Sequence, residues 1–429
     1  ARQDLERSLE QTKSDLETIN DKIAELVRQN REAFLSSYGQ LVRLNRSFEY
    51  RRYVGVYHDT FHMTGFIPTA DEQAFAARFA GLEGVTVDFK PHDSDKRFKT
   101  PTLLKNSRFC KPFEMFVDMY GRPAYNELDP TAFVAISYTL LFGLMFGDLG
   151  QGLVIALLGW GMARFKKMEF GRVLIRIGLS SAAFGLVYGS VFGLEEALDP
   201  LYHALGLEGK PVHVMDPLTI NNLLIFAVGL GVVLIVLSML MNIALGIKNR
   251  DWERAVFSQN GAAGLVFYTA VLIGVLSMLA GHSLFGPLYI LAFIAAPILL
   301  VFLKEPLGRL CKGEHGLLPE GVSPADFVID GFFELFDVAL SFVTNTMSFL
   351  RVGGFVISHA GMMAVVLTLT EMMTGAGSLV TLVVGNLFVM ALEGFIVGIQ
   401  VLRLEFYELF SHYFDGQGKP FEPIAAPRA

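Results

Sequence analysis

From Thr131 to Phe410, apolar stretches long enough to cross a bilayer recur, separated by short polar connections. A transmembrane helix needs about 20 mostly apolar residues, because the hydrocarbon core is about 30 Å thick and a helix rises about 1.5 Å per residue. The pattern predicts a mainly α-helical, polytopic membrane protein. We expect eight transmembrane helices, at residues 131–147, 149–164, 172–193, 219–246, 260–281, 286–303, 330–370 and 378–410.

The part before Thr131 has a different character. The 429 residues are 52% hydrophobic overall, yet residues 1–130 form a charged sequence typical of a soluble domain. The net charge of −7 says little about partners, because most charges lie outside the apolar stretches. Nothing resembles a basic nucleic-acid patch, so no nucleic-acid partner is expected. Cys110 and Cys311 have neither metal-ligand spacing nor the pattern of a disulfide framework.

Residues 1–52 are predicted as a cytoplasmic coiled-coil stalk helix. Apolar side chains recur there at alternating steps of three and four residues between charged positions, at Leu16, Ile19, Ile23, Leu26 and Ala33. The chain begins at Ala1 within this charged segment and carries no signal peptide. We therefore interpret it as a fragment whose upstream part supplies the pairing helix. The alternative is a solvated helix on a globular domain.

At residues 53–130 we expect a small cytoplasmic α/β lobe and a linker. Strands are predicted at 53–58, 63–67 and 85–89, with a helix that begins at a Thr69–Glu72 capping box and ends near Gly81. Residues 90–130 are turn-rich and lead to the eight-helix ion-translocation domain, which we place at 131–411. Residues 412–429 are predicted as a C-terminal tail.

Positive charges alternate between successive connections of the membrane domain. The connections at 164–176, 247–254 and 304–312 each carry three or more Lys and Arg, whereas those at 194–218, 282–285 and 371–377 carry one at most. Short cytoplasmic loops are enriched in Lys and Arg. The stalk, the lobe and the C-terminal tail are therefore predicted to be cytoplasmic.

The last two predicted spans are longer than a bilayer requires. Residues 330–370 would form a helix of about 60 Å, against about 30 Å of hydrocarbon. Such a helix must tilt steeply, break or project from the membrane. Residues 378–410 have the same excess to a lesser degree. We expect both helices to be long and tilted.

Each of these two stretches carries a polar stripe with an arginine. Placing an arginine at the centre of a membrane helix costs at least about 2.5–3.5 kcal/mol. A seven-residue step is nearly two helical turns, so residues at this spacing share one face. The first stripe contains Asp337, Thr344, Arg351 and Ser358, with Ser341, Ser348 and His359 beside it. The second contains Asn386, Glu393, Gln400 and Tyr407, with Arg403 one turn beyond Gln400.

The stripes favour a water-accessible ion path, because intramembrane ionisable residues usually face a bundle interior or an aqueous cavity. In the predicted orientation, Asp337 and Ser341 lie on the inner side of Arg351, whereas His359, Asn386 and Glu393 lie on the outer side of the arginines. This order suggests two offset half-channels separated by fixed positive charge. The alternative is an internal salt-bridge network in which Asp337 and Glu393 neutralise the arginines.

Several motifs resemble those of one family. They are Ser348-Phe-Leu-Arg-Val, Ser358-His-Ala, Glu393-Gly, Leu402-Arg-Leu, Phe146-Gly-Asp-Leu-Gly-Gln-Gly, Pro101-Thr-Leu-Leu-Lys-Asn and Tyr125-Asn-Glu with Asp129-Pro. In sequence and order, they are similar to the membrane subunit a, or subunit I, of V-type and archaeal-type rotary ATPases. The resemblance covers residues 50–429, and Val352-Gly353-Gly354, where eukaryotic members are bulkier, favours a prokaryotic member.

The resemblance implies a stator that couples H⁺ or Na⁺ translocation to ATP hydrolysis or synthesis. Its implied partners are a proteolipid c/K ring, peripheral-stalk subunits of E/G type, a central-stalk subunit of d/C type and the lipid bilayer. Arg351 matches the arginine that keeps a ring carboxylate ionised, and Arg403 matches the second one. Glu393 and His359 match outer half-channel residues, Asp337 the inner-channel acid, and Asp148 the acid of the first hairpin. No cofactor and no catalytic site of its own are implied, and the location is a prokaryotic plasma membrane.

Two other functions remain alternatives. A secondary transporter with an intramembrane arginine–carboxylate site would usually have repeated halves and a midplane site built on broken helices. Here the stripes belong to the last two spans alone, and a coiled-coil stalk is unexpected for a transporter. A membrane scaffold without transport would leave the arginines unexplained. A transporter should move a solute alone, whereas a stator should be inert without its ring.

Overall fold

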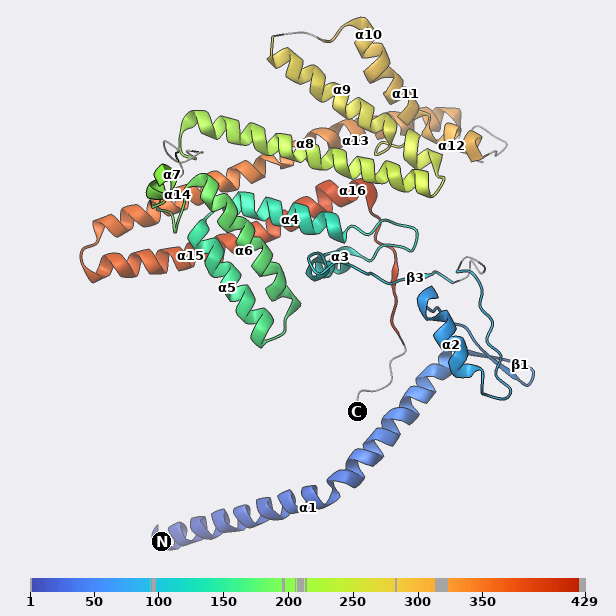
Figure 1. Cartoon of the computed structure of the whole chain (residues 1–429), viewed down its shortest axis with the longest axis vertical. Coiled ribbons are helices and arrows are strands. Elements are labelled where there is room, and N and C mark those ends of the chain that lie inside the picture. The colour runs from blue at the N-terminus through green and yellow to red at the C-terminus, as the bar shows by residue number, and fades with distance from the viewer. Residues whose placement is uncertain are drawn as a thin grey trace. The chain divides into compact units, whose positions relative to one another are not determined.

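The computed structural model describes residues 2–92, 94, 98–194, 197–204, 206, 212, 214–281, 284–312 and 323–423. The chain is mainly helical, as the sequence predicts (Figure 1). It divides into two compact units, residues 1–100 with 421–429 and residues 101–420. Each unit is described by itself.

The first unit begins with one long helix, α1 (Arg2–Tyr50), which bears the predicted apolar seam. Leu16, Ile19 and Ile23 each expose more than half of their surface, so the seam is uncovered in this chain. A short 3₁₀ helix, η1 (Arg51–Tyr53), follows α1. The long N-terminal helix is thus confirmed, and its pairing with a second helix stays a prediction.

A small hairpin and a short helix complete the first unit. Strands β1 (Val54–Tyr57) and β2 (Thr60–Met63) are antiparallel, with Val54 opposite Met63. They precede η2 (Thr69–Asp71) and α2 (Glu72–Phe79). His58, with φ 51°, makes the turn so tight that the second strand begins three residues earlier than expected. Residues 85–89 form no strand, since no described strand lies beside them to complete a ladder.

The second unit starts with residues that the sequence grouped with the lobe. They contain β3 (Pro101–Thr102), η3 (Lys111–Phe113) and α3 (Glu114–Tyr120). The rings of Phe113 and Phe116, both buried, lie 6.0 and 4.8 Å from the ring of Tyr138 in the first apolar helix. This aromatic packing attaches the segment to the helical unit, so the boundary between the units falls after Thr100.

A parallel strand pair joins the beginning and the end of the second unit. Strand β3 pairs with β4 (Lys419–Pro420), with Pro101 opposite Lys419. Beside this pair, the Gly418 N–H donates to the Arg122 carbonyl at 2.8 Å.

Helices form the rest of the second unit. They are α4 (Thr131–Phe146), α5 (Leu149–Phe165), α6 (Glu169–Tyr188), α7 (Asp199–Ala204), α8 (Pro217–Lys248), η4 (Glu253–Phe257), α9 (Ala262–Leu279), α10 (Pro287–Tyr289), η5 (Ile290–Ala295), α11 (Ala296–Phe302), α12 (Lys304–Lys312), α13 (Pro324–Ser348), α14 (Leu350–Met372), α15 (Ala376–Arg403), η6 (Leu404–Leu409) and α16 (Phe410–Tyr413). Three of these, η4, η5 and η6, are π-helical.

Five helices within the described ranges are long and apolar enough to cross a membrane: 169–188, 217–248, 253–279, 324–372 and 376–413. A sixth is reached if α10–α11 and α12, which meet at a bend of 69°, count as one span. Helices α4 and α5, the first two expected spans, are apolar but have only 16 and 17 residues. The structure therefore shows five to six candidate spans and indicates a multi-pass membrane protein, but it does not show eight.

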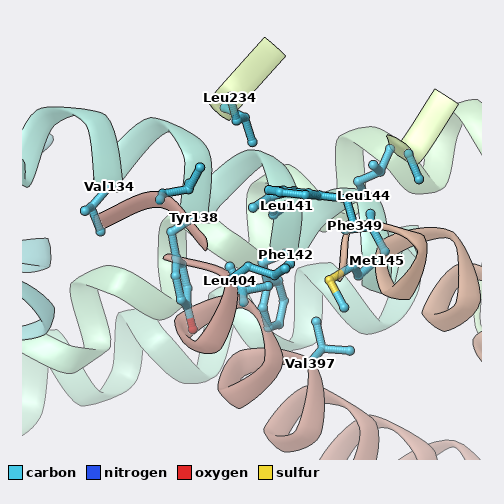
Figure 2. Close-up of a cluster of buried hydrophobic side chains, with 14 of the residues drawn as sticks. Val134, Tyr138, Leu141, Phe142, Leu144, Met145, Leu234, Phe349, Val397 and Leu404 are labelled. Atoms are coloured by element: carbon cyan, nitrogen blue, oxygen red, sulfur yellow. The ribbon is translucent and has the colours of Figure 1, made fainter. Parts of the chain in front are cut away.

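The main hydrophobic core surrounds α4 (Figure 2). Most of the helices of this unit contribute side chains to it. Those drawn around α4 include Val134, Tyr138, Leu141, Phe142, Leu144, Met145, Leu234, Phe349, Val397 and Leu404. Phe349, at the junction of α13 and α14, is completely buried and packs against Gly231 of α8. The helix pair with the polar stripes is therefore held against the centre of this core.

Candidate functional site

The two stripe-bearing helices are longer than a bilayer is thick, as expected. Helices α13 and α14 meet at Phe349 and together form an apolar helix of 49 residues, and α15 continues through η6 to Tyr413 over 38 residues. Helices α14 and α15 run side by side in opposite directions (Figure 1). His359 of α14 and Glu393 of α15 meet where these helices are in contact.

The stripe on α13 and α14 is largely uncovered. Asp337, Ser341, Thr344 and Ser358 are exposed, and Ser348 and Arg351 are half-buried. Burial of Ser, Thr and Asp against apolar neighbours would cost free energy without hydrogen-bond partners. The uncovered stripe is consequently a polar face on an otherwise apolar helix, and it is suited to contact water or a polar face of another chain.

The N-terminal part of the stripe on α15 is buried, and its Glu393 lies with His359 and Asp148 in a group of two carboxylates and an imidazole. The His359 Nδ1 atom lies 2.5 Å from Glu393 Oε2, and His359 Nε2 lies 3.9 Å from Asp148 Oδ2. Asp148, His359 and Glu393 expose 0, 6 and 1% of their surface. We call these three residues the outer cluster. The sequence analysis named all three, and Asp148 lies more than 200 residues before the other two.

Asp148 is held in place by four hydrogen bonds from its surroundings. It is the N-cap of α5: its Oδ1 accepts from the backbone N–H of Gln151 at 2.8 Å and of Phe192 at 3.1 Å. Its Oδ2 accepts from the Ser190 hydroxyl at 2.6 Å and from the Gly193 N–H at 2.9 Å. A carboxylate with four donors is strongly favoured in its ionised form. Asp148 thus supplies a fixed negative charge beside His359.

Gln151 is a member of the site that the sequence analysis missed. Its side-chain N–H donates to Asn386 Oδ1 at 3.0 Å and to Met363 Sδ at 3.3 Å, and its Oε1 atom is buried without a described partner. Asn386 in turn donates to the Leu382 carbonyl at 3.0 Å. The signal in the sequence was its place in the same Gly-rich motif as Asp148.

A cavity of about 780 Å³ reaches the outer cluster. Its lining includes Ser190, Gly193, His359, Met363 and Glu371. Glu371 is exposed near the end of α14, whereas His359 is buried three turns earlier. The cavity therefore leads from the helix end toward the imidazole. In the described ranges, no group of three His, Cys, Asp or Glu side chains is placed to hold a metal ion.

The inner end of α15 and η6 brings a different set together. Arg403 is exposed, and Gln400 is half-buried with its Oε1 atom lacking a described partner. Glu408, buried in η6, lies within electrostatic range of Arg351 and Arg403, but among the described residues it forms no salt bridge with either, and its Oε2 atom has no hydrogen-bond partner. We call Arg351, Arg403 and Glu408 the inner group.

Glu405 and Glu408 escaped the sequence analysis because they depart from the seven-residue spacing. Both lie in η6, where the π-helical turn changes which residues share a face. Two glutamates in an apolar stretch were the feature of the sequence that could have identified them as candidate site residues.

The structure also bears on the salt-bridge alternative. Glu393 pairs with His359, and Asp337 is exposed. Among the described residues, neither carboxylate forms a salt bridge with Arg351 or Arg403. The pairing considered from the sequence is therefore absent, and the carboxylate near the arginines is Glu408.

Comparisons with known proteins agree on one family. A family model described as the V-type ATPase 116kDa subunit family matches residues 1–174. The chain is 30% identical to A-type ATP synthase subunit I of Aeropyrum pernix, over 76% of this chain and 51% of the relative. It is 26% identical to subunit I of Pyrococcus horikoshii, over 86% of this chain and 54% of the relative. It is 23% identical to subunit I of Methanocaldococcus jannaschii, over 99% of this chain and 63% of the relative. The chain spans about half the length of the first two of these relatives.

Proposed function

We propose that this chain, which belongs to the V-type ATPase 116kDa subunit family and is homologous to A-type ATP synthase subunit I over most of its length, is the membrane stator of a rotary ATPase. The observation that carries the proposal is the uncovered polar stripe of α13 and α14 with Arg351 at its centre. A polar face on a membrane helix requires a polar neighbour or water. A ring of small subunits, each with an ion-binding carboxylate, would supply such a neighbour.

Arg351 would act as a fixed charge past which ring carboxylates turn. A guanidinium stays charged in proteins and favours the ionised form of a nearby carboxylate. A bound H⁺ or Na⁺ is therefore released as a ring carboxylate reaches Arg351. Once it has passed, the ionised group cannot enter lipid at low cost until it binds an ion again. Transport and rotation then become coupled.

The two ion paths would lie on opposite sides of the arginines. The cavity at His359, with Glu393 and Asp148, supports an outer half-channel, since an imidazole between two carboxylates can accept a proton on one side and release it on the other. Asp337, Ser341, Thr344 and Ser348 would line the inner one. In this proposal α4 and α5 complete a set of eight spans, and both chain ends are cytoplasmic.

The proposed partners are the ring, the peripheral stalks and a central-stalk subunit. The uncovered seam of α1 is suited to pairing with a second helix, as a stator arm requires. The ion is H⁺ or Na⁺, since its selective ligands would belong to the ring. The chain would carry no nucleotide site, so ATP chemistry would occur on other subunits.

The test is ATP-driven ion transport by the complete ATPase with Arg351→Ala or Arg351→Lys in this chain. We expect coupled transport to be lost while the complex still assembles. Arg164→Ala, at an exposed position near the end of α5, is the matched control and should transport normally. Normal pumping by the Arg351→Ala complex would refute the stator mechanism.

A further inference from the structure

Within the described part of the chain, no ion pair fixes the guanidinium of Arg351. The side chain forms no salt bridge with a described residue, and its buried Nη1 atom has no hydrogen-bond partner there. A free arginine side chain has many rotamers, and bonds at its charged end are what usually restrict them. The place of this guanidinium therefore depends on the helix that carries it.

That helix has a break just before Arg351. Phe349 separates α13 from α14. The Phe349 N–H donates to the Thr346 carbonyl at 3.3 Å, and the Val352 N–H donates to the Phe349 carbonyl at 3.0 Å. Both bonds span three residues, and a short stretch of this tighter kind within a helix often marks a hinge. The break is therefore the point at which the direction of Arg351 can change.

The α14 side of the break is packed on α8. The Phe349 ring is completely buried, and a Cβ at Gly231 of α8 would lie 2.2 Å from it (Figure 2). A Cβ at Gly353 of α14 would lie 2.9 Å from a methyl group of Leu224, also of α8. Contacts as close as these leave little room for the start of α14 to move toward α8.

The α13 side of the break is hydrogen-bonded to α9. The hydroxyl oxygens of Tyr268 and Thr346 lie 2.8 Å apart, and the two residues expose 3 and 8% of their surface. The Thr346 hydroxyl has a single proton, which it donates to the Phe342 carbonyl at 2.7 Å, so Tyr268 is the donor to Thr346. The rings of Tyr268 and Phe342 lie 5.1 Å apart. Thr346 thus joins the break, through its carbonyl, to α9, through its hydroxyl.

We propose that Tyr268 is a positioning residue for Arg351; this role rests on the proposed stator function. Its hydrogen bond to Thr346 holds the end of α13 against α9, so the break at Phe349 presents the guanidinium to the ring in one direction. A ring carboxylate that reaches Arg351 then meets the positive charge and releases its ion. Without the bond, α13 moves about the break, and some ring carboxylates pass with their ion still bound. ATP hydrolysis then continues without transport.

The experiment measures ions transported per ATP hydrolysed by complete ATPases that carry Tyr268→Phe or Tyr289→Phe. Tyr289→Phe is the matched control, because the Tyr289 hydroxyl donates to the Ala270 carbonyl of the same helix α9, also at 2.8 Å, and this bond does not reach α13. Each variant loses one hydroxyl with one hydrogen bond, so we expect similar thermal midpoints. Because the ratio is taken per ATP, it does not depend on how much complex assembles.

Tyr268→Phe should lower this ratio about two- to fivefold, since one net hydrogen bond changes an equilibrium between two positions about fivefold. Tyr289→Phe should keep the ratio of the unmodified complex. Equal ratios for the two variants would overturn the proposal.

Variants of Thr346 test whether Tyr268 acts through this residue. Thr346→Ser keeps the accepting hydroxyl and should keep the ratio, whereas Thr346→Val removes it and should lower the ratio at least as much as Tyr268→Phe. The double variant of Tyr268→Phe and Thr346→Val should be no worse than Thr346→Val alone, because both changes break the same bond. A further fall in the double variant, or an unchanged ratio with Thr346→Val, overturns the proposal. Normal pumping by Arg351→Ala would instead refute the stator function.

Discussion

Replacing Asp148 by asparagine should destabilise the hairpin of α5 and α6 far more than the change of one atom suggests, because Asp148 joins the start of α5 to the turn after α6. The two oxygens of Asp148 each accept two hydrogen bonds. Asparagine has one oxygen and an NH₂ group, so one pair of donors must face another donor. The Ser190 hydroxyl can rotate and accept, but the backbone N–H of Gly193 cannot. The NH₂ group should therefore take the Oδ2 position and leave the Gly193 N–H unpaired.

The expected loss follows from this geometry. One lost hydrogen bond to a charged acceptor corresponds to about 1.5–3 kcal/mol, and the bonds that remain lose their charge assistance. The total is about 2–4 kcal/mol. The turn at residues 190–193 should tolerate the loss of a hydrogen bond poorly. Phe192 has φ 51°, which is unfavourable for a bulky residue, and its N–H is one of the four donors to Asp148. Ser190 and Gly193 line the cavity, so its shape should change too.

The assay is thermal denaturation of the purified complex in detergent, followed by the loss of native ring association. Asp216→Asn is the matched control, since Asp216 is the exposed N-cap of α8 and accepts no capping hydrogen bond. We expect the midpoint of the Asp148→Asn complex to lie about 3–6 °C below that of the control, because the shift in midpoint is the lost free energy divided by the unfolding entropy of the helical unit. Equal midpoints would show that the four hydrogen bonds do not stabilise the hairpin.

Two further predictions concern the helices around Arg351 and the outer cluster. A Cβ at Gly231 would lie 2.2 Å from the buried Phe349 ring, whereas one at Gly229 would meet nothing within 4 Å. Gly231→Ala should therefore lower the free energy of unfolding by about 1–3 kcal/mol and slow coupled transport. Equal thermal stability and transport of Gly231→Ala and Gly229→Ala would contradict this packing. Glu393→Gln should slow ion uptake about 100-fold without loss of assembly, because His359 loses its partner at 2.5 Å; uptake at the unmodified rate would exclude Glu393 from the path.

The outer cluster was accessible to sequence analysis because its members are ionisable residues in apolar surroundings. Asp148, His359 and Glu393 each stand out where a charge is expensive. Their contact across separate helices could not be derived from spacing, since it depends on how α5, α14 and α15 pack. The resemblance to a known family paired His359 with Glu393 and named Asp148 separately, as the acid of the first hairpin; that Asp148 lies beside His359 is known from the structure alone.

The inner group was only half predicted, for a physical reason. The cost of a charge in an apolar stretch selected Arg351 and Arg403, and helical spacing placed Arg351 on the first stripe and Arg403 one turn beyond Gln400. Glu408 lies beyond the start of η6, where the π-helical turn breaks that rule. Likewise, hydropathy predicted spans over α4 and α5, but it could not predict that the carboxylate between them would join the start of α5 to the turn after α6.

The pairing of β3 with β4 has a mechanical consequence. The polypeptide enters the helical unit at Pro101 and leaves it at Pro420, and these two points are fastened together by backbone hydrogen bonds, with Arg122 and Gly418 beside them. Tension on either flanking segment is therefore received at one common anchor before it reaches α4 or α16. In the proposed stator, a single point of attachment would be an advantage. A pull at this anchor would displace the helical unit as a whole and leave the spacing between Arg351 and Arg403 unchanged.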